Sequence, residues 1–366
     1  MSIREPSGEI RSQLNFCANN YLGFSGRQDI IDAQIAACNS HGAGVSSVRF
    51  ICGTQDIHKN LERQIADFHG REDAIIYPSC FDANAGLFEI LVNNEDVVIS
   101  DELNHASIID GIRLCKASKA RFLHMDLVDL EQKLKENMDK RRRLVVTDGV
   151  FSMDGDIAPL KEIHELCTKY DAMLMIDECH ATGFLGATGK GTEELLNCEG
   201  ASTVINSTMG KALSGAAGGY TTGPKEIIEL LRNRSRPYSF SNSLPPPVVA
   251  ACSKAFEIVA SDEGARLSAD LAAKTERFRS KMRALGFTIS GGDHPISPVM
   301  VYDSHKALAL GKAMAEEGIF VIPFSFPVVA RGKERIRVQI NTCHSIEDID
   351  RTVEAFGKAG KKLGII

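Results

Sequence analysis

Residues 143–177, RLVVTDGVFSMDGDIAPLKEIHELCTKYDAMLMID, are the stretch that decides the fold. The stretch opens with an apolar, β-branched run at 143–149 and closes with another apolar run at 172–177. Between them, residues 160–170 carry apolar side chains at helical spacing. A strand, a helix and a second strand in this order are typical of two parallel strands joined by a crossover helix. The stretch therefore predicts one unit of an α/β fold.

The same alternation extends in both directions along the chain. Further apolar runs predict strands at 74–78, 96–100 and 202–207, and the pattern at 129–141 predicts a helix. Uninterrupted apolar strands favour a mostly parallel sheet that helices cover on both faces. Ligands of such sheets bind beyond the carboxyl ends of the strands.

A proline-rich stretch at 241–249, SNSLPPPVV, interrupts this alternation. A helical segment at roughly 249–285 follows it, and the elements after that are mixed, as in a smaller α+β unit. Strands are expected at 287–290, 297–303, 319–324 and 335–340, and helices from 304 and from 345. We expect an N-terminal segment at 1–24, a large domain at 25–245 and a small C-terminal domain at 246–366.

The composition argues against several classes of function. The 42 basic and 48 acidic residues give no reason to expect a nucleic-acid partner. No apolar run approaches the roughly 20 residues that span a bilayer, so no membrane span is expected. The start, MSIREPSGEI, resembles neither a secretory signal nor a transit peptide. The ten cysteines lack C-x-x-C spacing, which favours free thiols in a reducing compartment, and nothing beside Cys179 and His180 completes a zinc set. No metal site is expected.

Polar side chains follow several of the predicted strands at the point where each strand ends. They are His105, Ser152, Asp177 with His180, and Thr208 with Lys211. A single polar residue in such a place is usually a helix cap or a turn residue, but together they indicate a ligand site. Two glycine-rich nucleotide motifs fail: GATGKGT (186–192) lacks the spacing of a phosphate loop, and GAGVSS (42–47) lacks the third glycine of a dinucleotide fingerprint.

Lys211 stands alone among small residues in STMGKALSGAAGGY (207–220). Glycines let the main chain and a flat cofactor approach closely, so the amine can meet a planar aldehyde. A lysine in such surroundings can serve as nucleophile and base. The aldehyde cofactor pyridoxal phosphate (PLP) needs a carboxylate beside its pyridine nitrogen, and Asp177 at a strand end is suited to that role. The alternative is a solvated lysine in a glycine-rich surface loop.

Nine segments extend this interpretation to a family. They are NFCANNYLG (15–23), SVRFICGTQ (47–55), SCFDANAGLFE (79–89), DELNHASIIDGIRLCKA (101–117), GVFSMDGDIAPL (149–160), DECHATGFLG (177–186), STMGKALSGAAGGYTTG (207–223), RPYSFSNSLPP (236–246) and RIRVQI (335–340). In this order, the segments resemble those of the α-oxoamine synthases. The resemblance implies PLP as cofactor and the aminotransferase type I fold, with a large, mostly parallel sheet domain and a smaller α+β C-terminal domain.

The resemblance also implies roles for the strand-end residues. Lys211 would attach the cofactor covalently and then move the Cα proton of the substrate. Asp177 would pair with the pyridinium nitrogen, and His105 would stack on the ring and contact the substrate. His180 and Ser152 would hydrogen-bond around the phenolate oxygen.

For the phosphate, the resemblance implies the backbone of Cys80 and Phe81 at a helix start, together with the Thr208 hydroxyl. It also implies Ser241 and Asn242 of a neighbouring subunit, which would make the active site a property of a homodimer.

For the substrate carboxylate, the resemblance favours Arg337, with help from Asn19. The planar fork of donors on arginine is suited to a carboxylate. Strand alternation puts Arg335 and Arg337 on the same face, so spacing alone leaves both open.

Within the family, the segments are most similar to the branch that acylates glycine. That similarity implies interconversion of glycine and acetyl-CoA with 2-amino-3-ketobutyrate and CoA, in threonine breakdown. Other α-oxoamine synthases stay open as alternatives, namely those that make 8-amino-7-oxononanoate or 5-aminolevulinate, and so does a non-catalytic scaffold of the same fold. The family carries a longer segment before NFCANNYLG, so the one here is expected to be shortened. The sequences of DECHATGFLG and RIRVQI resemble those of eukaryotic members more than those of bacterial ones. This resemblance favours a mitochondrial location over a cytoplasmic one.

Overall fold

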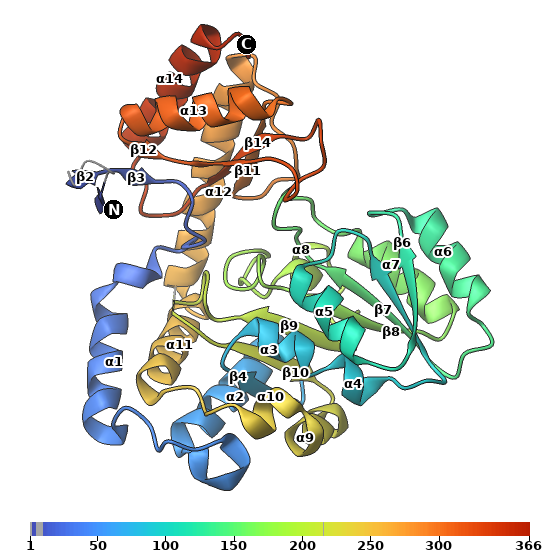
Figure 1. Ribbon diagram of the computed structural model, residues 1–366. Coiled ribbons are helices and arrows are strands. Elements are labelled where there is room, and N and C mark those ends of the chain that lie inside the picture. The colour runs from blue at the N-terminus through green and yellow to red at the C-terminus, as the bar shows by residue number, and fades with distance from the viewer. Residues whose placement is uncertain (1, 5–9, 215) are drawn as a thin grey trace. The chain divides into compact units, whose positions relative to one another are not determined.

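The computed structural model describes residues 2–4, 10–214 and 216–366, which form two compact units (Figure 1). The larger unit comprises residues 24–151 and 157–265. The smaller unit comprises the described residues up to Gly23 together with 152–156 and 266–366. Part of the predicted N-terminal segment, at 1 and 5–9, lies outside the described residues, as does residue 215 of the lysine loop.

The described part of the larger unit is built around a seven-stranded sheet. In spatial order its strands are β4 (Asp73–Tyr77), β10 (Gly219–Gly223), β9 (Val204–Thr208), β8 (Met173–Asp177), β7 (Arg143–Asp148), β5 (Val97–Asp101) and β6 (Ser118–Phe122). β10 runs antiparallel to both of its neighbours, and every pairing from β9 to β6 is parallel. The predicted mostly parallel sheet is confirmed.

Helices cover both faces of this sheet. They are α1 (Gln28–His41), α2 (Asp56–His69), α3 (Cys80–Ala85), α4 (Phe88–Leu91), α5 (Ala106–Leu114), α6 (Leu127–Glu136), α7 (Leu160–Lys169), α8 (Thr192–Leu195), α9 (Lys225–Arg234), α10 (Arg236–Phe240) and α11 (Pro246–Val259), with short helical turns η1 (Phe24–Gly26) and η2 (Arg49–Gly53). Leu144 and Val146 of β7 pack with residues of α3, α4, α5 and α9, whereas Val145 packs with residues of α6 and α7. Alternate side chains of one strand thus enter two separate cores.

The predicted strands of the large sheet correspond to β4, β5, β7, β8 and β9, but two strands were missed. β6 has the sequence SKARF and lies at the sheet edge, with most of its residues at least partly exposed, so it lacks an apolar run. β10 has the sequence GYTTG and is fully buried. Its glycines and threonines carry too little apolar character to be separated from the preceding loop.

The smaller unit combines short sheets with three helices in its described residues. Its strands form the antiparallel order β11 (Ile296–Met300), β14 (Arg335–Gln339) and β13 (Ile322–Phe324), the parallel pair β12 (Ile319–Phe320) and β3 (Leu14–Asn15), and the antiparallel pair β1 (Ser2–Arg4) and β2 (Ile10–Ser12). Most of α12 (Asp262–Ala284) belongs to this unit, and α13 (Ser304–Glu316) and α14 (Ile346–Lys362) lie side by side in it (Figure 1).

The structure places the unit boundary later than the sequence predicted. The proline stretch is no linker, because Pro246 occupies the first turn of α11, where a missing N–H costs no helical hydrogen bond. α11 packs against α1 and α2 and so belongs to the larger unit. The chain enters the smaller unit at residues 265–266, within α12, so the helical segment expected at 249–285 is two helices. The strand expected at 287–290 reduces to one bridge between Ile289 and Val299.

Two expectations from composition can be compared with the described residues. All ten cysteines carry free thiols there. None of the described helices is both long enough and apolar enough to cross a membrane.

Candidate active site

Lys211 lies in the loop that joins β9 to β10. The hydroxyl of Thr208, at the end of β9, donates to the carbonyl oxygen of Gly218 (3.2 Å) and accepts from the N–H of Gly210 (3.0 Å), which ties the two ends of the loop together. The Nζ of half-buried Lys211 lies 2.9 Å from Nε2 of the buried His180. The loop therefore holds an amine beside an imidazole with which it can exchange a proton.

Asp177 ends β8 and is 3% exposed. Its Oδ2 accepts from the amide of Asn84 (2.8 Å) and from the thiol of Cys80 (3.8 Å), and its Oδ1 accepts from the N–H of Cys179 (2.9 Å). Among the described residues, these hydrogen-bond donors are all neutral. A buried carboxylate is costly unless a cation joins it, so Asp177 is suited to a positively charged ligand.

Asn84 of α3 is a site residue that the sequence reasoning missed. It is fully buried, and its Nδ2 donates both to Asp177 and to Oγ of Ser107 (2.9 Å). Its Oδ1 accepts from Nδ2 of Asn206 (2.8 Å), which lies on β9 opposite Asp177. Tight packing of α3 on α5 holds it there, since a Cβ on Gly111 would lie 2.6 Å from the Asn84 carbonyl oxygen. In the sequence, Asn84 could have been recognised as a polar amide on a helix face that packs against apolar residues.

His105 immediately precedes α5, and its ring nitrogen Nδ1 accepts from the N–H of Ser107 (3.2 Å). Because Nδ1 is an acceptor, the neutral ring carries its proton on Nε2. Burial lowers the pKa of His105; the charge of Asp177 opposes this effect and that of Lys211 adds to it. The residue is nevertheless exposed and so accessible to a ligand.

A second carboxyl, Asp148 on β7, lies opposite Asp177 in the sheet register. Its Oδ2 accepts from the backbone N–H of His105 (3.0 Å). Burial, together with the charge of Asp177, raises the pKa of Asp148 well above its usual range. Two adjacent buried carboxyls do not readily both ionise, so this environment favours the neutral form of Asp148.

The start of α3 holds Cys80 and Phe81, which were predicted to contact a phosphate. Ser79 caps this helix by accepting from the N–H of Asp82 (3.1 Å). Cys80 is buried, and the Phe81 side chain is exposed. A Cβ on Gly219 would lie 2.2 Å from the backbone nitrogen of Cys80, so only glycine lets β10 pass the first turn of α3. The role of these residues in phosphate binding stays a prediction.

Ser241 and Asn242 follow α10. Asn242 forms a bridge with Val48, and the N–H of Ser243 donates to the carbonyl oxygen of Ser47 (3.1 Å). These contacts do not link Ser241 and Asn242 to Lys211, and their predicted contribution to a neighbouring subunit stays a prediction.

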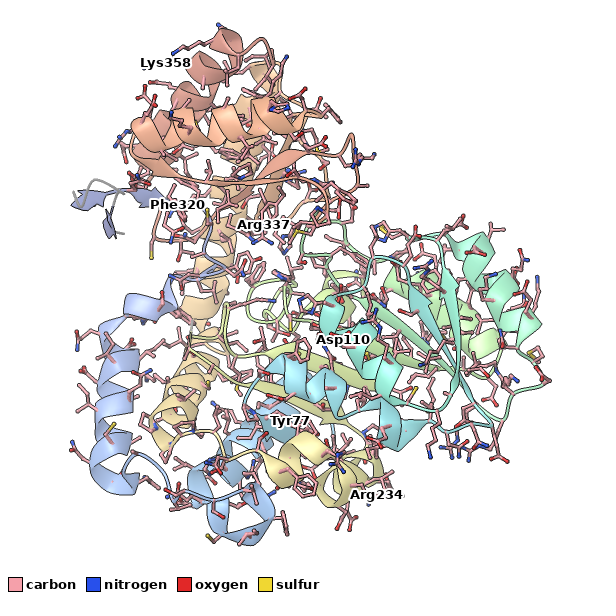
Figure 2. The ribbon with its side chains drawn as sticks, in the orientation of Figure 1. Tyr77, Asp110, Arg234, Phe320, Arg337 and Lys358 are labelled. Carbon is pink, nitrogen blue, oxygen red and sulfur yellow. The ribbon has the colours of Figure 1, made fainter. Side chains whose placement is uncertain are left out.

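Three predicted residues lie in the smaller unit, and there Arg337 differs from Arg335. Arg335 donates to the carboxylate of Asp154 and to the carbonyl oxygen of Met153 (3.0 Å), and its side chain is 5% exposed. Arg337, labelled in Figure 2, donates to the carbonyl oxygen of Ser152 (2.9 Å), its hydrogen-bond partner among the described residues. Burial lowers the pKa of Arg337. A half-buried guanidinium with one backbone partner retains donors for a carboxylate, whereas the guanidinium of Arg335 is already paired with the carboxylate of Asp154.

Asn19 completes this group in the smaller unit. Its Oδ1 accepts from Nε2 of Gln339 on β14 (2.7 Å), two residues beyond Arg337 on the same strand face. The structure thus collects Lys211, His180, Asp177, His105, Cys80 and Thr208 in the larger unit, and Ser152, Asn19 and Arg337 in the smaller one.

The residues of the larger unit fit the chemistry of PLP. A buried carboxylate with only neutral donors matches a pyridinium N–H, and a lysine amine beside an imidazole matches an aldehyde. At Gly219, β10 and the first turn of α3 pass so closely that a Cβ would meet the Cys80 backbone.

Comparison with known proteins agrees with this geometry. The family model of aminotransferases class I and II matches residues 11–356. The chain is 62% identical over 353 residues to the mitochondrial 2-amino-3-ketobutyrate coenzyme A ligase of Mus musculus, covering 96% of this chain and 84% of the relative. It is 45% identical over 357 residues to the 8-amino-7-oxononanoate synthase of Symbiobacterium thermophilum, covering 97% and 90%.

A solved structure of SPT with its PLP internal aldimine matches all of this chain and 94% of its own, with a TM-score of 0.94 and 30% identity. A match that spans nearly the whole chain, in sequence and in fold, shows that this chain belongs to the aminotransferase class I and II family.

Proposed function

We propose that this chain is a PLP-dependent glycine C-acetyltransferase, which interconverts glycine and acetyl-CoA with 2-amino-3-ketobutyrate and CoA in threonine breakdown. The observation that carries the proposal is the buried carboxylate of Asp177, bonded by neutral donors, in the same unit as the Lys211 amine. The name of the mouse relative supports the choice of substrate.

Each residue of the larger unit has a defined task in this proposal. When bound, PLP supplies an electron sink for the charge left as the Cα proton of glycine departs. Lys211 takes and returns that proton, and the imidazole of His180, 2.9 Å from its amine, accepts or supplies the proton in turn. Asp177 keeps a positive charge at the ring nitrogen, and Asp148 stays neutral beside it. His105 presents an Nε2–H donor to the ligand.

In the smaller unit, Arg337 is the proposed partner of the glycine carboxylate, and Asn19 assists it. Arginine binds a carboxylate through two parallel hydrogen bonds, which fixes orientation as well as charge. The partners of Arg335 support the choice of Arg337, because Asp154 and Met153 occupy the Arg335 guanidinium.

The test is a comparison of substrates on purified, PLP-loaded protein. Glycine with acetyl-CoA is expected to give CoA release at a kcat/KM at least tenfold above that of alanine with a long-chain acyl-CoA or of glycine with succinyl-CoA, a margin of about 1.4 kcal/mol. Preference for alanine and a long acyl chain would instead assign 8-amino-7-oxononanoate synthesis. Lys211→Ala is the control that separates enzyme turnover from thioester hydrolysis.

We also propose a homodimer whose sites are shared through Ser241 and Asn242, and a mitochondrial location. The support is the resemblance of the segment at 236–246 for the shared sites and the word "mitochondrial" in the name of the mouse relative for the location. Mixing Lys211→Ala subunits with Asn242→Ala subunits should restore activity, because one site of each hybrid would hold both native residues. Inactive hybrids that are shown to form would argue for sites within single subunits.

A further inference from the structure

Two thiols and a carboxylate lie close together within the proposed cofactor site. The Sγ atoms of Cys80 and Cys179 and a carboxylate oxygen of Asp177 all lie within 4.8 Å of one another. Cys80 begins α3, which follows β4, and Asp177 ends β8, which is three positions away from β4 in the sheet. α3 packs over β10 and β9, which carries Cys80 to the carboxyl end of β8. The sequence spacing around Cys179 predicted no such group, because Cys80 lies 99 residues earlier.

The distances are close to those of a tetrahedral thiolate site. With Zn–S bonds of about 2.3 Å and a Zn–O bond of about 2.0 Å, two sulfurs lie about 3.8 Å apart and a sulfur and an oxygen about 3.5 Å apart. The Cys80 Sγ lies 3.8 Å from Oδ2 of Asp177. Small side-chain adjustments therefore bring the three ligand atoms to the corners of a tetrahedron around one ion. A water or an exchangeable ligand can take the fourth corner.

The electrostatics of the group also suit a cation. Asp177 is buried with neutral donors, and in the absence of a bound cofactor its charge lacks a hydrogen-bonded cation among the described residues. Its Oδ2 accepts from Asn84 and from the Cys80 thiol, and a cation that displaces the thiol proton can take the position of the second donor. Cys80 and Cys179 are free thiols, so each sulfur has to give up a proton when it binds a cation.

We propose that the cofactor-free chain binds a thiophilic divalent cation, with Zn²⁺ or Co²⁺ as the fitting probe, through Cys80, Cys179 and Asp177. Binding forms two metal–sulfur bonds and one metal–oxygen bond and releases one proton from each thiol to solvent. Since Asp177 is also the proposed partner of the PLP ring nitrogen, the cation and the cofactor exclude one another. The exclusion rests on the proposed function, whereas the cation site itself does not.

The experiment titrates Co²⁺ into cofactor-free protein and follows the sulfur-to-cobalt charge-transfer absorbance and the bound metal per chain. One thiolate-bound ion per chain is expected, lost in Cys80→Ala and in Cys179→Ala. Cys167→Ala is the matched control, because this buried cysteine of α7 lies in the core on the opposite sheet face and should leave the absorbance unchanged. Circular dichroism confirms that each variant is folded. An unchanged cobalt spectrum in folded Cys80→Ala, or no such spectrum in the native chain, would overturn the site.

A competition in the unaltered chain needs no variant. At a cation concentration ten times its Kd, the apparent Kd of PLP should rise about elevenfold, and saturating PLP should abolish the charge-transfer absorbance. Simultaneous binding of both would overturn the exclusion. Failure of PLP to bind even without metal, while the cobalt absorbance depends on Cys80 and Cys179, would sink the proposed function and leave the cation site standing.

Discussion

Replacing Asn84 with alanine should weaken cofactor binding from a position that is not expected to touch the cofactor. The substitution removes a hydrogen bond of 2.8 Å to the Asp177 carboxylate and one of 2.9 Å to Ser107. It also leaves the Asn206 amide, which donates to Asn84 over 2.8 Å, without that acceptor. Asn84 therefore links the proposed partner of the ring nitrogen to the helix start that orients His105.

The magnitude follows from these three bonds. A hydrogen bond to a charged group contributes about 1.5–3 kcal/mol, a neutral one about 1 kcal/mol, and a stranded buried donor costs about 1–3 kcal/mol. Because the bonds form one network, they do not add fully, and the free energy of unfolding should fall by about 3–5 kcal/mol. The share that acts on Asp177, about 2 kcal/mol, corresponds to a cofactor Kd roughly thirtyfold higher.

The assay is urea unfolding of the cofactor-free chain, paired with PLP titration of folded protein. Ser235→Ala is the control, because the buried Ser235 hydroxyl accepts from Tyr77 (3.1 Å) and donates to the Gly86 carbonyl oxygen (3.1 Å) without contacting Asp177. This control should lose about 1–3 kcal/mol of stability and keep its cofactor affinity within twofold. A wild-type Kd in folded Asn84→Ala, or an equal rise in both variants, would refute the reasoning.

Four further substitutions probe other parts of the account. Burial raises the pKa of Glu178 from 4.5 to about 8. Between these pH values the folded chain holds a proton that the unfolded chain has lost, so the free energy of unfolding should fall by up to about 1.4 kcal/mol for each unit by which the pH rises. Glu178→Gln should flatten this slope, as measured by urea unfolding at several pH values. Arg337→Lys should raise the KM for glycine about 10–100-fold, because lysine cannot form the bidentate contact to the carboxylate. Arg335→Lys weakens the contact to Asp154, so it should lower the melting temperature and leave the KM for glycine within threefold. The reverse pattern would exchange the roles of the two arginines. Gly219→Ala should cost about 1–3 kcal/mol and weaken PLP binding, because its Cβ would meet the Cys80 backbone at 2.2 Å; unaltered stability would show that α3 can move aside.

Much of the larger unit could be predicted because buried parallel strands are apolar throughout. β7 and β8 are examples, with every residue of β7 buried and a strand-end Asp177 that is visible in sequence. β10 was not predicted, because this buried strand consists mainly of glycine and threonine rather than large apolar residues. The domain boundary was misplaced because prolines that begin α11 resemble a linker in sequence.

The site was predictable only where chemistry falls at a strand end. Asn84 and the thiol of Cys80 reach Asp177 from a helix that follows a strand three positions away in the sheet, and no spacing rule brings them together. The choice between Arg335 and Arg337 needed the ion pair of Arg335 with Asp154, since strand alternation treats the two arginines alike.

The claim on which the account depends is that Lys211 bonds covalently to PLP while Asp177 faces the ring nitrogen. Borohydride reduction of the PLP-loaded chain, followed by peptide mapping by mass spectrometry, tests it most directly. The account predicts a single pyridoxyl label on Lys211, and in Asp177→Ala a label at the same residue with markedly lower cofactor retention. A label on a different lysine, or none on a chain that retains PLP, would contradict it.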